Sequence, residues 1–516
     1  MQPAKSSVRS PKGDLSPKGR LSPERELATD HLTADIGRRS RRGGVVLMAA
    51  QAVRVVGQMA TLVVLARLLP PEAFGLLAMV AAIGAILDLV KEFGLSAATI
   101  QRQDITHAQV SALFWVNAGV GTILGFGLFL SAPLLAYFYG QPALTGVAHW
   151  LALAFVASGF TVQHWALLRR QMRFVAIAGM ETAADLLGFA VAIGLAIWGA
   201  GYWALVAQRL VSPVFLMVAS WLICRWRPAR PARTADVRGL LGFGISVTGS
   251  GLAVAFSRSI DQILIGWLWG PAVLGLYERT TRLLLMPVNT INAPVYAAAM
   301  PALSRLNGEP ARYRAMFGQV MQKVAFLTMP AFALAAMTAD WVVEILLGPS
   351  WIKAIPLVAL FSVSATYLPV LMAAGLLYMT QARTGQMLKA TLIDAGLCVA
   401  SIVIGLQWGV NGVAAALAIV GLTLRTPVAF WLATRQGPVR VADIWRAIAP
   451  PASTAVTVAG AVFLVRQVEP VPTAAGIASV GASTLVVGLL GLLAWPETRR
   501  ELMALMSLPV RRPRPT

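Results

Sequence analysis

The residues of this chain that could do chemistry are arginines and carboxylates set inside long apolar stretches. The basic ones are Arg54, Arg209, Arg258, Arg279, Arg282 and Arg425, and the acidic ones are Asp88, Glu181, Asp185, Asp261, Glu278 and Asp394. An ionisable side chain at membrane depth costs roughly 2.5–3.5 kcal/mol on insertion scales, so such residues usually face a polar cavity or pair with an opposite charge. Arginine in a cavity suits a phosphate or carboxylate ligand, because its planar guanidinium can donate two parallel hydrogen bonds.

Arg54 is the strongest candidate for a ligand-binding cation. Gln51 and Gln58 lie three residues before it and four residues after it, so one face of a helix carries Gln-Arg-Gln. A lipid-facing surface would not tolerate that polar stripe. The stripe indicates either a cation with two polar neighbours lining a cavity, or an ion pair with Asp88 or Glu92 of the next helix, and the sequence leaves both open.

Other charges are spaced for local pairing. Arg258 and Asp261 are three residues apart, and Glu278 and Arg282 are four apart, so each pair can meet on one helical face. Pairing of Glu278 with Arg282 would leave Arg279 as the freer cation.

Arg209 and Arg425 precede Pro213 and Pro427 in corresponding helices. We expect them to hydrogen-bond backbone carbonyls that the prolines free, or to extend toward the membrane surface, rather than to bind a ligand.

Three carboxylates are candidates for ion coupling. Glu181 and Asp185 are four residues apart and repel each other when both are ionised, so either one is protonated or a cation lies nearby. Asp394 is the third candidate. The four histidines lack metal-ligand spacing and the two cysteines form no CxxC motif, so we expect no metal site and no cofactor.

The composition places these charges in a membrane protein. Hydrophobic residues make up 57% of the chain, charged residues 13%, and the mean hydropathy is +0.70. Soluble domains are about 45–50% apolar and about 25% charged, so this excess needs lipid as a second solvent. The net charge of +21 does not indicate nucleic-acid binding, because the basic residues fall between apolar runs and at the two ends, as in cytoplasmic loops.

The apolar runs are long enough for about fourteen transmembrane helices. They cover residues 44–66, 73–96, 111–138, 145–168, 175–198, 202–224, 240–268, 273–303, 320–347, 354–380, 387–407, 411–433, 449–467 and 473–495. If the N-terminus is cytoplasmic, arginines recur in every cytoplasmic loop, whereas the opposite loops hold only Arg67, Lys353 and Arg466. The positive-inside rule therefore predicts a multi-pass protein of the bacterial inner membrane with both termini in the cytoplasm.

The chain repeats itself. Residues 65–77 (LARLLPPEAFGLL) and 265–277 (IGWLWGPAVLGLY) share a proline and a glycine, Pro71/Pro271 and Gly75/Gly275, and residues 194–207 resemble 405–418. Both matches fall at turns of equivalent helix pairs. The repeat predicts an all-α membrane protein with two six-helix lobes in the same orientation, related by a pseudo-twofold axis along the membrane normal, a plan known in transporters. The expected segments are a basic tail (1–42), two lobes (43–238 and 239–434), two further helices (435–495) and a second basic tail (496–516).

Two segments carry a family resemblance. ARLLPPEAFGLLAMV (66–80) and SRSIDQILIGWLWGPAVLGLYERTTRLLLMPVNTINAPVYAAAMPALSRL (257–306) resemble the Wzx-like oligosaccharide flippases, in their exopolysaccharide and colanic-acid exporter branch. That group belongs to the multidrug/oligosaccharidyl-lipid/polysaccharide exporter superfamily. The resemblance implies a two-lobed transporter that moves undecaprenyl-pyrophosphate-linked oligosaccharide to the periplasmic leaflet. It also implies arginines on the first helix of each lobe and its neighbour as cavity cations, here Arg54, Arg258 and Arg279.

Two other functions compete with this interpretation. A multidrug or organic-cation antiporter of the same superfamily would need an acidic cavity, whereas the first helix here carries Arg54 and no acid. A polymerase or glycosyltransferase would need large loops with catalytic acids, and the loops opposite the cytoplasm are only a few residues long, so we expect no enzyme. No GxxxxGK[ST] motif occurs, so transport would not use ATP hydrolysis on this chain.

Expected partners are membrane lipid, the lipid-linked oligosaccharide, a polysaccharide polymerase and a chain-length regulator, and no nucleic acid.

Overall fold

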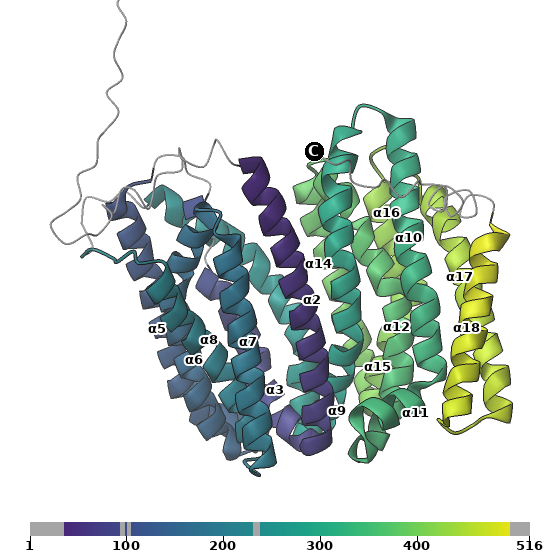
Figure 1. Ribbon diagram of the computed structural model, residues 1–516, viewed down its shortest axis with the longest axis horizontal. Helices are drawn as coiled ribbons and strands as arrows, with labels where there is room; N and C mark the ends of the chain where they lie inside the picture. The colour runs from purple at the N-terminus through teal and green to yellow at the C-terminus, as the bar shows by residue number, and fades with distance from the viewer. Residues whose placement is uncertain (1–35, 93–98, 101–104, 231–237, 496–516) are drawn as a thin grey trace, which may run out of the picture.

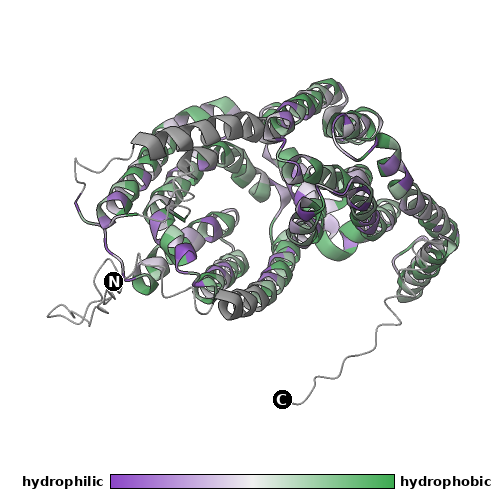
Figure 2. Cartoon of the chain, turned by 90° about the horizontal axis from the view of Figure 1, so that it is seen from above, coloured by the Kyte–Doolittle hydropathy of each residue, from purple (hydrophilic) through white to green (hydrophobic). Residues whose placement is uncertain are grey.

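The computed structural model describes residues 36–92, 99–100, 105–230 and 238–495, and within these ranges every regular element is a helix. The side chains of residues 36–47, 89–92 and 238–258 lie outside the described set. The expected C-terminal tail (496–516) and most of the expected N-terminal tail (1–42) also lie outside the described residues. The helix α2 begins at Ile36, inside the segment that was expected to be the N-terminal tail. Two bundles of steeply inclined helices stand side by side (Figure 1), and hydrophobic residues predominate over both when they are seen from above (Figure 2).

The first bundle contains six long helices that follow the expected spans. They are α2 (Ile36–Leu68), α3 (Pro71–Glu92), α5 (His107–Tyr139), α6 (Ala143–Arg170), α7 (Phe174–Ile197) and α8 (Trp203–Ile223). The turns between them begin where the sequence stops favouring helix. Gly140, for example, takes a left-handed φ of 63° after α5 and donates to the carbonyls of Ala136 and Tyr137.

The second bundle begins with the 68-residue α9 (Arg238–Arg305), in which Gly270 interrupts the helical backbone with φ 77° and ψ −176°. The other long helices are α10 (Pro310–Met337), α12 (Ile355–Ala374), α14 (Thr384–Gly405), α15 (Gly409–Val420) and α16 (Thr426–Thr434). Short elements join them: α11 (Ala339–Val342), η2 (Val343–Leu347), η3 (Pro349–Ala354), α13 (Leu376–Thr380), η4 (Leu406–Trp408) and η5 (Gly421–Arg425).

Two further helices, α17 (Val441–Val468) and α18 (Ala474–Ala494), lie beside the second bundle (Figure 1). Arg466 near the end of α17 donates to Asp340 at 2.5 Å and to the carbonyl of Met337, and the Trp341 indole donates to the carbonyl of Pro470. These contacts join α17 to the end of α10 and to α11.

Twelve described segments are long and apolar enough to cross a membrane. Two of them, with 47 and 51 residues, are about twice the length that one crossing needs. Each is interrupted by a glycine with positive φ, Gly270 in one and Gly409 in the other. Counted as two crossings each, they give about the fourteen helices that the sequence predicts.

One expected span is misplaced. The ninth was expected over 320–347, but α10 runs from Pro310 to Met337 and the chain then continues in short turns. Pro310 fixes the first turn of α10, and an Arg312–Glu309 ion pair at 2.7 Å closes its exposed polar end. Thr338, with φ −118° and ψ 29°, ends the helix. The hydropathy pattern located the most apolar residues, whereas the helix begins before them, in polar sequence.

The two bundles meet where α3 crosses the second half of α9. A Cβ on Gly75 would lie 1.7 Å from the carbonyl oxygen of Pro271, and a Cβ on Gly275 would lie 1.8 Å from that of Pro71. Only glycine permits this approach of the two backbones. The contact is reciprocal, as two segments related by a local twofold axis must be.

The packing of helices within each bundle also repeats. In the first bundle α2 packs on α7, α5 on α6, and α7 on α8. In the second, α9 packs on α14, α10 on α12, and α14 on α15. The same succession of apolar helices therefore forms the same arrangement twice.

Candidate functional site

Arg54 joins α2 to α7 through two carboxylates. Its Nη1 donates to Glu181 at 2.5 Å and its Nε donates to Asp185 at 2.8 Å. The side chains of Arg54, Glu181 and Asp185 are 24%, 26% and 22% exposed. We call these three residues the α2–α7 cluster.

The α2–α7 cluster gives the partners of Arg54 and the cation near Glu181 and Asp185, both of which the sequence left open. Arg54 forms its ion pairs with Glu181 and Asp185 of α7, beside which α2 packs, and the side chain of Glu92 lies outside the described residues. The same guanidinium is the nearby cation that two carboxylates four residues apart require. Gln51 is exposed and Gln58 half-buried on the same stripe of α2, so the polar face is only partly covered.

A second group of charges gathers where the two bundles meet, and we call it the inter-lobe cluster. It contains Asp88 of α3, Arg209 of α8, and Glu278, Arg279 and Arg282 of α9. The expected pairing of Glu278 with Arg282 is confirmed, with a distance of 3.5 Å. Arg209 is exposed, and the charges of Arg282, Glu278 and Asp88 all act on it. Cations from both bundles therefore lie within electrostatic reach of one another.

Arg279 is placed differently from its neighbours. It is only 5% exposed, and its guanidinium stacks on the Phe74 ring with 3.8 Å between the central carbon and the ring centroid. It has no ion pair among the described residues, and its Nε lacks a hydrogen-bond partner there. In this conformation the expected freer cation is packed into the α3–α9 crossing, whereas Arg282 is 50% exposed.

The expected pair of Arg258 and Asp261 is only partly described. The backbone of Arg258 lies in α9, but its side chain falls outside the described set. Asp261 accepts hydrogen bonds from the Tyr277 hydroxyl at 2.7 Å and from the Gln262 backbone at 2.8 Å. The bond from Tyr277 joins the two halves of α9 on either side of Gly270.

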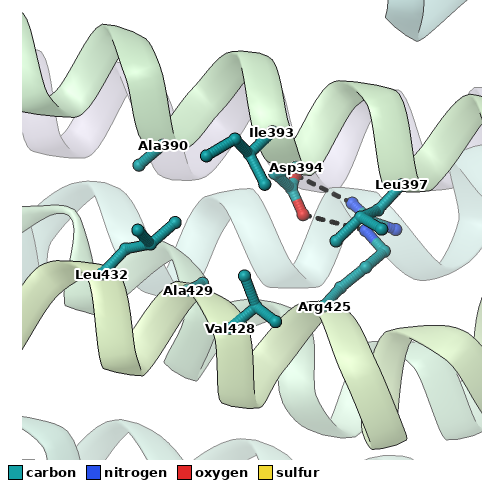
Figure 3. Close-up of a pocket in the computed structure, with 8 residues that line it drawn as sticks. All are labelled: Ala390, Ile393, Asp394, Leu397, Arg425, Val428, Ala429 and Leu432. Atoms are coloured by element: carbon teal, nitrogen blue, oxygen red, sulfur yellow. Dashed lines mark hydrogen bonds and ion pairs between the residues drawn. The ribbon is translucent and has the colours of Figure 1, made fainter.

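Asp394 and Arg425 form a two-point ion pair between α14 and the end of η5 (Figure 3), with distances of 2.9 and 3.0 Å. Apolar side chains flank the pair, among them Ile393, Leu397 and Val428. The expectation that Arg425 hydrogen-bonds freed carbonyls or extends to the surface is wrong. The sequence could not place α14 beside η5, and a buried guanidinium takes a carboxylate in preference to a backbone carbonyl.

The molecule is closed between the bundles at the end that carries Pro71 and Pro271. The Trp351 indole donates to the carbonyl of Ala66 at 2.7 Å and is itself fully buried against Phe74. Arg67 donates to the carbonyl of Ile345. These contacts, which we call the terminal seal, hold α2 of the first bundle against η2 and η3 of the second.

Arg209 is the residue that sequence reasoning undervalued. The signal available was only an arginine inside an apolar run, and its nearness to the charges of α9 depends on how the two bundles meet. Among the described residues, no group of three or more histidines, cysteines or carboxylates is arranged to hold a metal ion. The charged groups that the structure describes form ion pairs within each lobe, and the inter-lobe cluster holds three arginines and two carboxylates.

The architecture is that of a two-lobed, multi-pass membrane protein. A lipid II flippase, MurJ, in an inward closed conformation has a TM-score of 0.71 with this chain at 11% identity, covering 89% of this chain and all of MurJ. A multidrug resistance transporter of the MATE family, in an inward-facing conformation, has a TM-score of 0.57 at 14% identity, covering 75% of this chain and 97% of the transporter. At these identities the likeness concerns the fold.

Within that class the family is settled by sequence. Residues 64–356, more than half of the chain, match the polysaccharide biosynthesis protein family, so the chain belongs to it. The lipopolysaccharide biosynthesis protein WzxC of Escherichia coli K12 is 26% identical over 373 residues, which is 72% of this chain and 76% of WzxC. The resemblance to Wzx-like proteins is thereby confirmed.

Proposed function

We propose that this protein is a flippase that moves undecaprenyl-pyrophosphate-linked oligosaccharide units across the membrane for polysaccharide biosynthesis. The carrying observation is the inter-lobe cluster, in which the charges of Arg282 and Glu278 in one lobe act on Arg209 in the other. Family membership and the fold shared with a lipid II flippase support the same substrate class. We further propose that the membrane is the bacterial inner membrane and that both termini are cytoplasmic.

The physical problem is to carry sugars and phosphates through hydrocarbon. Each unsatisfied polar group there costs several kcal/mol, so the headgroup needs a polar path while the polyprenyl chain stays in lipid. The boundary between the lobes offers that path. Arginines on both sides would offset the pyrophosphate charge, and a carboxylate beside them, Glu278, limits how tightly the anion is held.

Alternating access supplies the movement. The terminal seal closes one end of the boundary through Trp351 and Arg67. Rocking of the lobes about the α3–α9 crossing would break the seal and release the substrate on that side. The same motion would uncover Arg279, which stacks on Phe74 in the closed arrangement, and we propose Arg279 as a cation that engages the substrate after the lobes move.

The energy source is proposed to be an ion gradient. In the α2–α7 cluster, two carboxylates share one arginine, so the cluster carries an excess negative charge when both are ionised. Glu181 or Asp185 could take up a proton or another cation as α2 moves. Asp394 is the third candidate for ion coupling from the sequence, and Arg425 neutralises its charge. Asp394 would take part in coupling only when its ion pair with Arg425 opens.

The test is export in cells whose own polysaccharide flippase has been deleted. Complementation by Arg209→Gln/Arg282→Gln should fall at least tenfold while the protein level in the membrane holds, because the boundary loses two cations. Arg209→Lys/Arg282→Lys should recover part of the activity. The matched control is Arg312→Gln, which removes an exposed arginine at the end of α10. Full export by the double glutamine variant would refute the proposed site.

The α2–α7 cluster also supports a second candidate, an organic-cation antiporter. Its two carboxylates lie at membrane depth in one lobe and are partly exposed. That function predicts that ethidium accumulates less in cells making the protein, and that Glu181→Gln/Asp185→Asn abolishes the difference. Unchanged ethidium accumulation together with restored polysaccharide export would eliminate the antiporter.

A polysaccharide polymerase and a chain-length regulator are proposed as partners, because a flipped oligosaccharide unit must be polymerised on the far side. Their co-purification with this protein from mildly solubilised membranes tests this.

A further inference from the structure

An apolar groove of about 530 Å³ lies between α6 and α8, away from every charged cluster described above. Its lining residues are Val156, Phe160, Met217, Val218, Trp221 and Leu222. The Trp221 indole donates to the carbonyl of Phe160 at 3.1 Å, which holds the ring across the groove between the two helices. The volume is within the range of about 300–1,000 Å³ that is usual for ligand pockets.

The groove opens to the outside of the bundle. Val218 and Leu222 are 50% and 68% exposed, so the groove lies at the surface of the bundle. In a membrane this face meets lipid, not the proposed path of the oligosaccharide.

One end of the groove carries a fixed cation. Beyond Ile223, where α8 ends, Arg227 donates from Nη1 to the carbonyls of Trp221 at 2.8 Å and Trp226 at 2.9 Å. Its guanidinium lies 5.3 Å from the centroid of the Trp221 ring. Arg227 is exposed, although two backbone carbonyls hold its guanidinium in place.

Further arginines surround Arg227. Arg225 and Arg230 are exposed in the same segment, and Arg173 donates to the carbonyl of Ile223 at 3.2 Å. Between residues 105 and 230 the sequence holds only two acids, Glu181 and Asp185, and both pair with Arg54. No carboxylate among the described residues neutralises this rim.

We infer that this groove is a binding site for an anionic phospholipid, with an acyl chain between α6 and α8 and the headgroup phosphate on Arg225 and Arg227. The apolar lining requires a hydrocarbon chain, which excludes free phosphate as the occupant. The basic rim requires an anionic headgroup, and basic pockets between transmembrane helices bind such lipids. Trp221 lies at the junction, where tryptophan is favoured at a membrane interface. The inference goes beyond flipping and does not depend on it.

The probe is a phospholipid with brominated acyl chains, which quenches tryptophan fluorescence on contact. The full-length protein is reconstituted in phosphatidylcholine vesicles with increasing brominated phosphatidylglycerol or, in parallel, brominated phosphatidylcholine. The Trp221 signal is the difference between the wild type and Trp221→Phe. Trp198→Phe, which removes an exposed tryptophan at the other end of the molecule, is the matched control. We expect the Trp221 signal to be quenched at a lower fraction of phosphatidylglycerol than of phosphatidylcholine.

The arginines are tested in the same assay. Each basic residue near a membrane surface contributes about fivefold to the binding of anionic lipid, so Arg225→Gln/Arg227→Gln should reduce the preference by about 30-fold. Arg225→Lys/Arg227→Lys should retain most of it. High salt should weaken the preference of the wild type, which gives a readout that needs no variant. Equal quenching by both lipids, or displacement by equimolar undecaprenyl phosphate, would overturn the inference. Polysaccharide export, measured separately, reports on flipping alone.

Discussion

At the scale of residues, the charges inside this protein are paired across helices that lie side by side. Arg54 meets Glu181 and Asp185 on α7, and Asp394 meets Arg425 on the other side of a helical hairpin. Each pair lies inside one lobe, so it stabilises that lobe. The inter-lobe cluster differs, because its cations come from both lobes and its composition is positive on balance.

Removal of Arg54 should therefore act first on stability. Arg54→Ala leaves two carboxylates without their cation at membrane depth, at a cost of roughly 2–3 kcal/mol. We expect a lower thermal midpoint in detergent and less protein in the membrane. Glu181→Gln and Asp185→Asn in the same chain should restore both, since the uncompensated charges are gone.

The thermal measurement needs a surface control, for which Arg312→Ala serves. A normal midpoint for Arg54→Ala together with lost export would show that Arg54 binds substrate, as the stripe of Gln51, Arg54 and Gln58 first suggested.

At the scale of elements, the α3–α9 crossing fixes how the lobes meet. Backbone atoms, not side chains, form the contact, because Gly75 faces the carbonyl of Pro271 and Gly275 faces that of Pro71. A close crossing of two helices at small residues is a common basis of packing in membranes. The crossing is also where Arg279 is buried, so its geometry controls that cation.

A single methyl group at this crossing should separate the lobes. Gly75→Ala or Gly275→Ala would place a Cβ less than 2 Å from a carbonyl oxygen, which neither backbone can avoid without moving. We expect a marked loss of folded protein, measured by size-exclusion chromatography of membrane extracts. Gly127→Ala in α5 is the control, because a Cβ there meets nothing within 4 Å. Normal folding of both crossing variants would mean that the lobes do not meet this closely.

At the scale of the whole molecule, the terminal seal determines which side is open. Trp351→Phe keeps an aromatic ring against Phe74 but removes the hydrogen bond to Ala66, so the open form should become more populated. In a background without Cys224 and Cys398, a cysteine at the buried Leu69 should then react faster with a membrane-impermeant thiol reagent.

Two comparisons calibrate the labelling of Leu69→Cys. Trp198→Cys, at an exposed position, should react at the same rate with or without Trp351→Phe. If Leu69→Cys reacts no faster in the Trp351→Phe chain, then the hydrogen bond does not hold the lobes together.

Orientation also belongs to the whole molecule. The first residues of α2 and the last residues of α18 lie at the same end (Figure 1), as an even number of crossings requires. The arginine-rich loops lie at that end, so reporter fusions to either terminus should give cytoplasmic signals. A periplasmic signal from one of them would require an odd number of crossings.

The sequence by itself determined the class of protein and most of its helices. Apolar runs of about 20 residues are sufficient to locate a transmembrane helix, because the bilayer sets the length and backbone hydrogen bonds close within the helix. Pro71/Pro271 and Gly75/Gly275 also identified the repeat, since a turn and a close approach restrict the residue type. The pairing of Glu278 with Arg282 followed from helical spacing alone. Hydropathy misplaced some helix ends, because α2 and α17 begin eight residues before their expected spans and α10 begins and ends ten residues early.

The tertiary structure decided the partners of the buried charges. Helix order along the chain does not give helix neighbours in space, so the sequence offered only Asp88 and Glu92 of α3 as ion-pair partners for Arg54, which pairs with α7. Arg425 was assigned to the backbone when it pairs with Asp394, and Arg209 was undervalued although the charge of Arg282 acts on it. Arg279 was expected to be accessible but is stacked on Phe74. Ion pairing between different helices has no period in the sequence. It depends on which helices pack together and on the depth of each charge, and only the folded molecule fixes both.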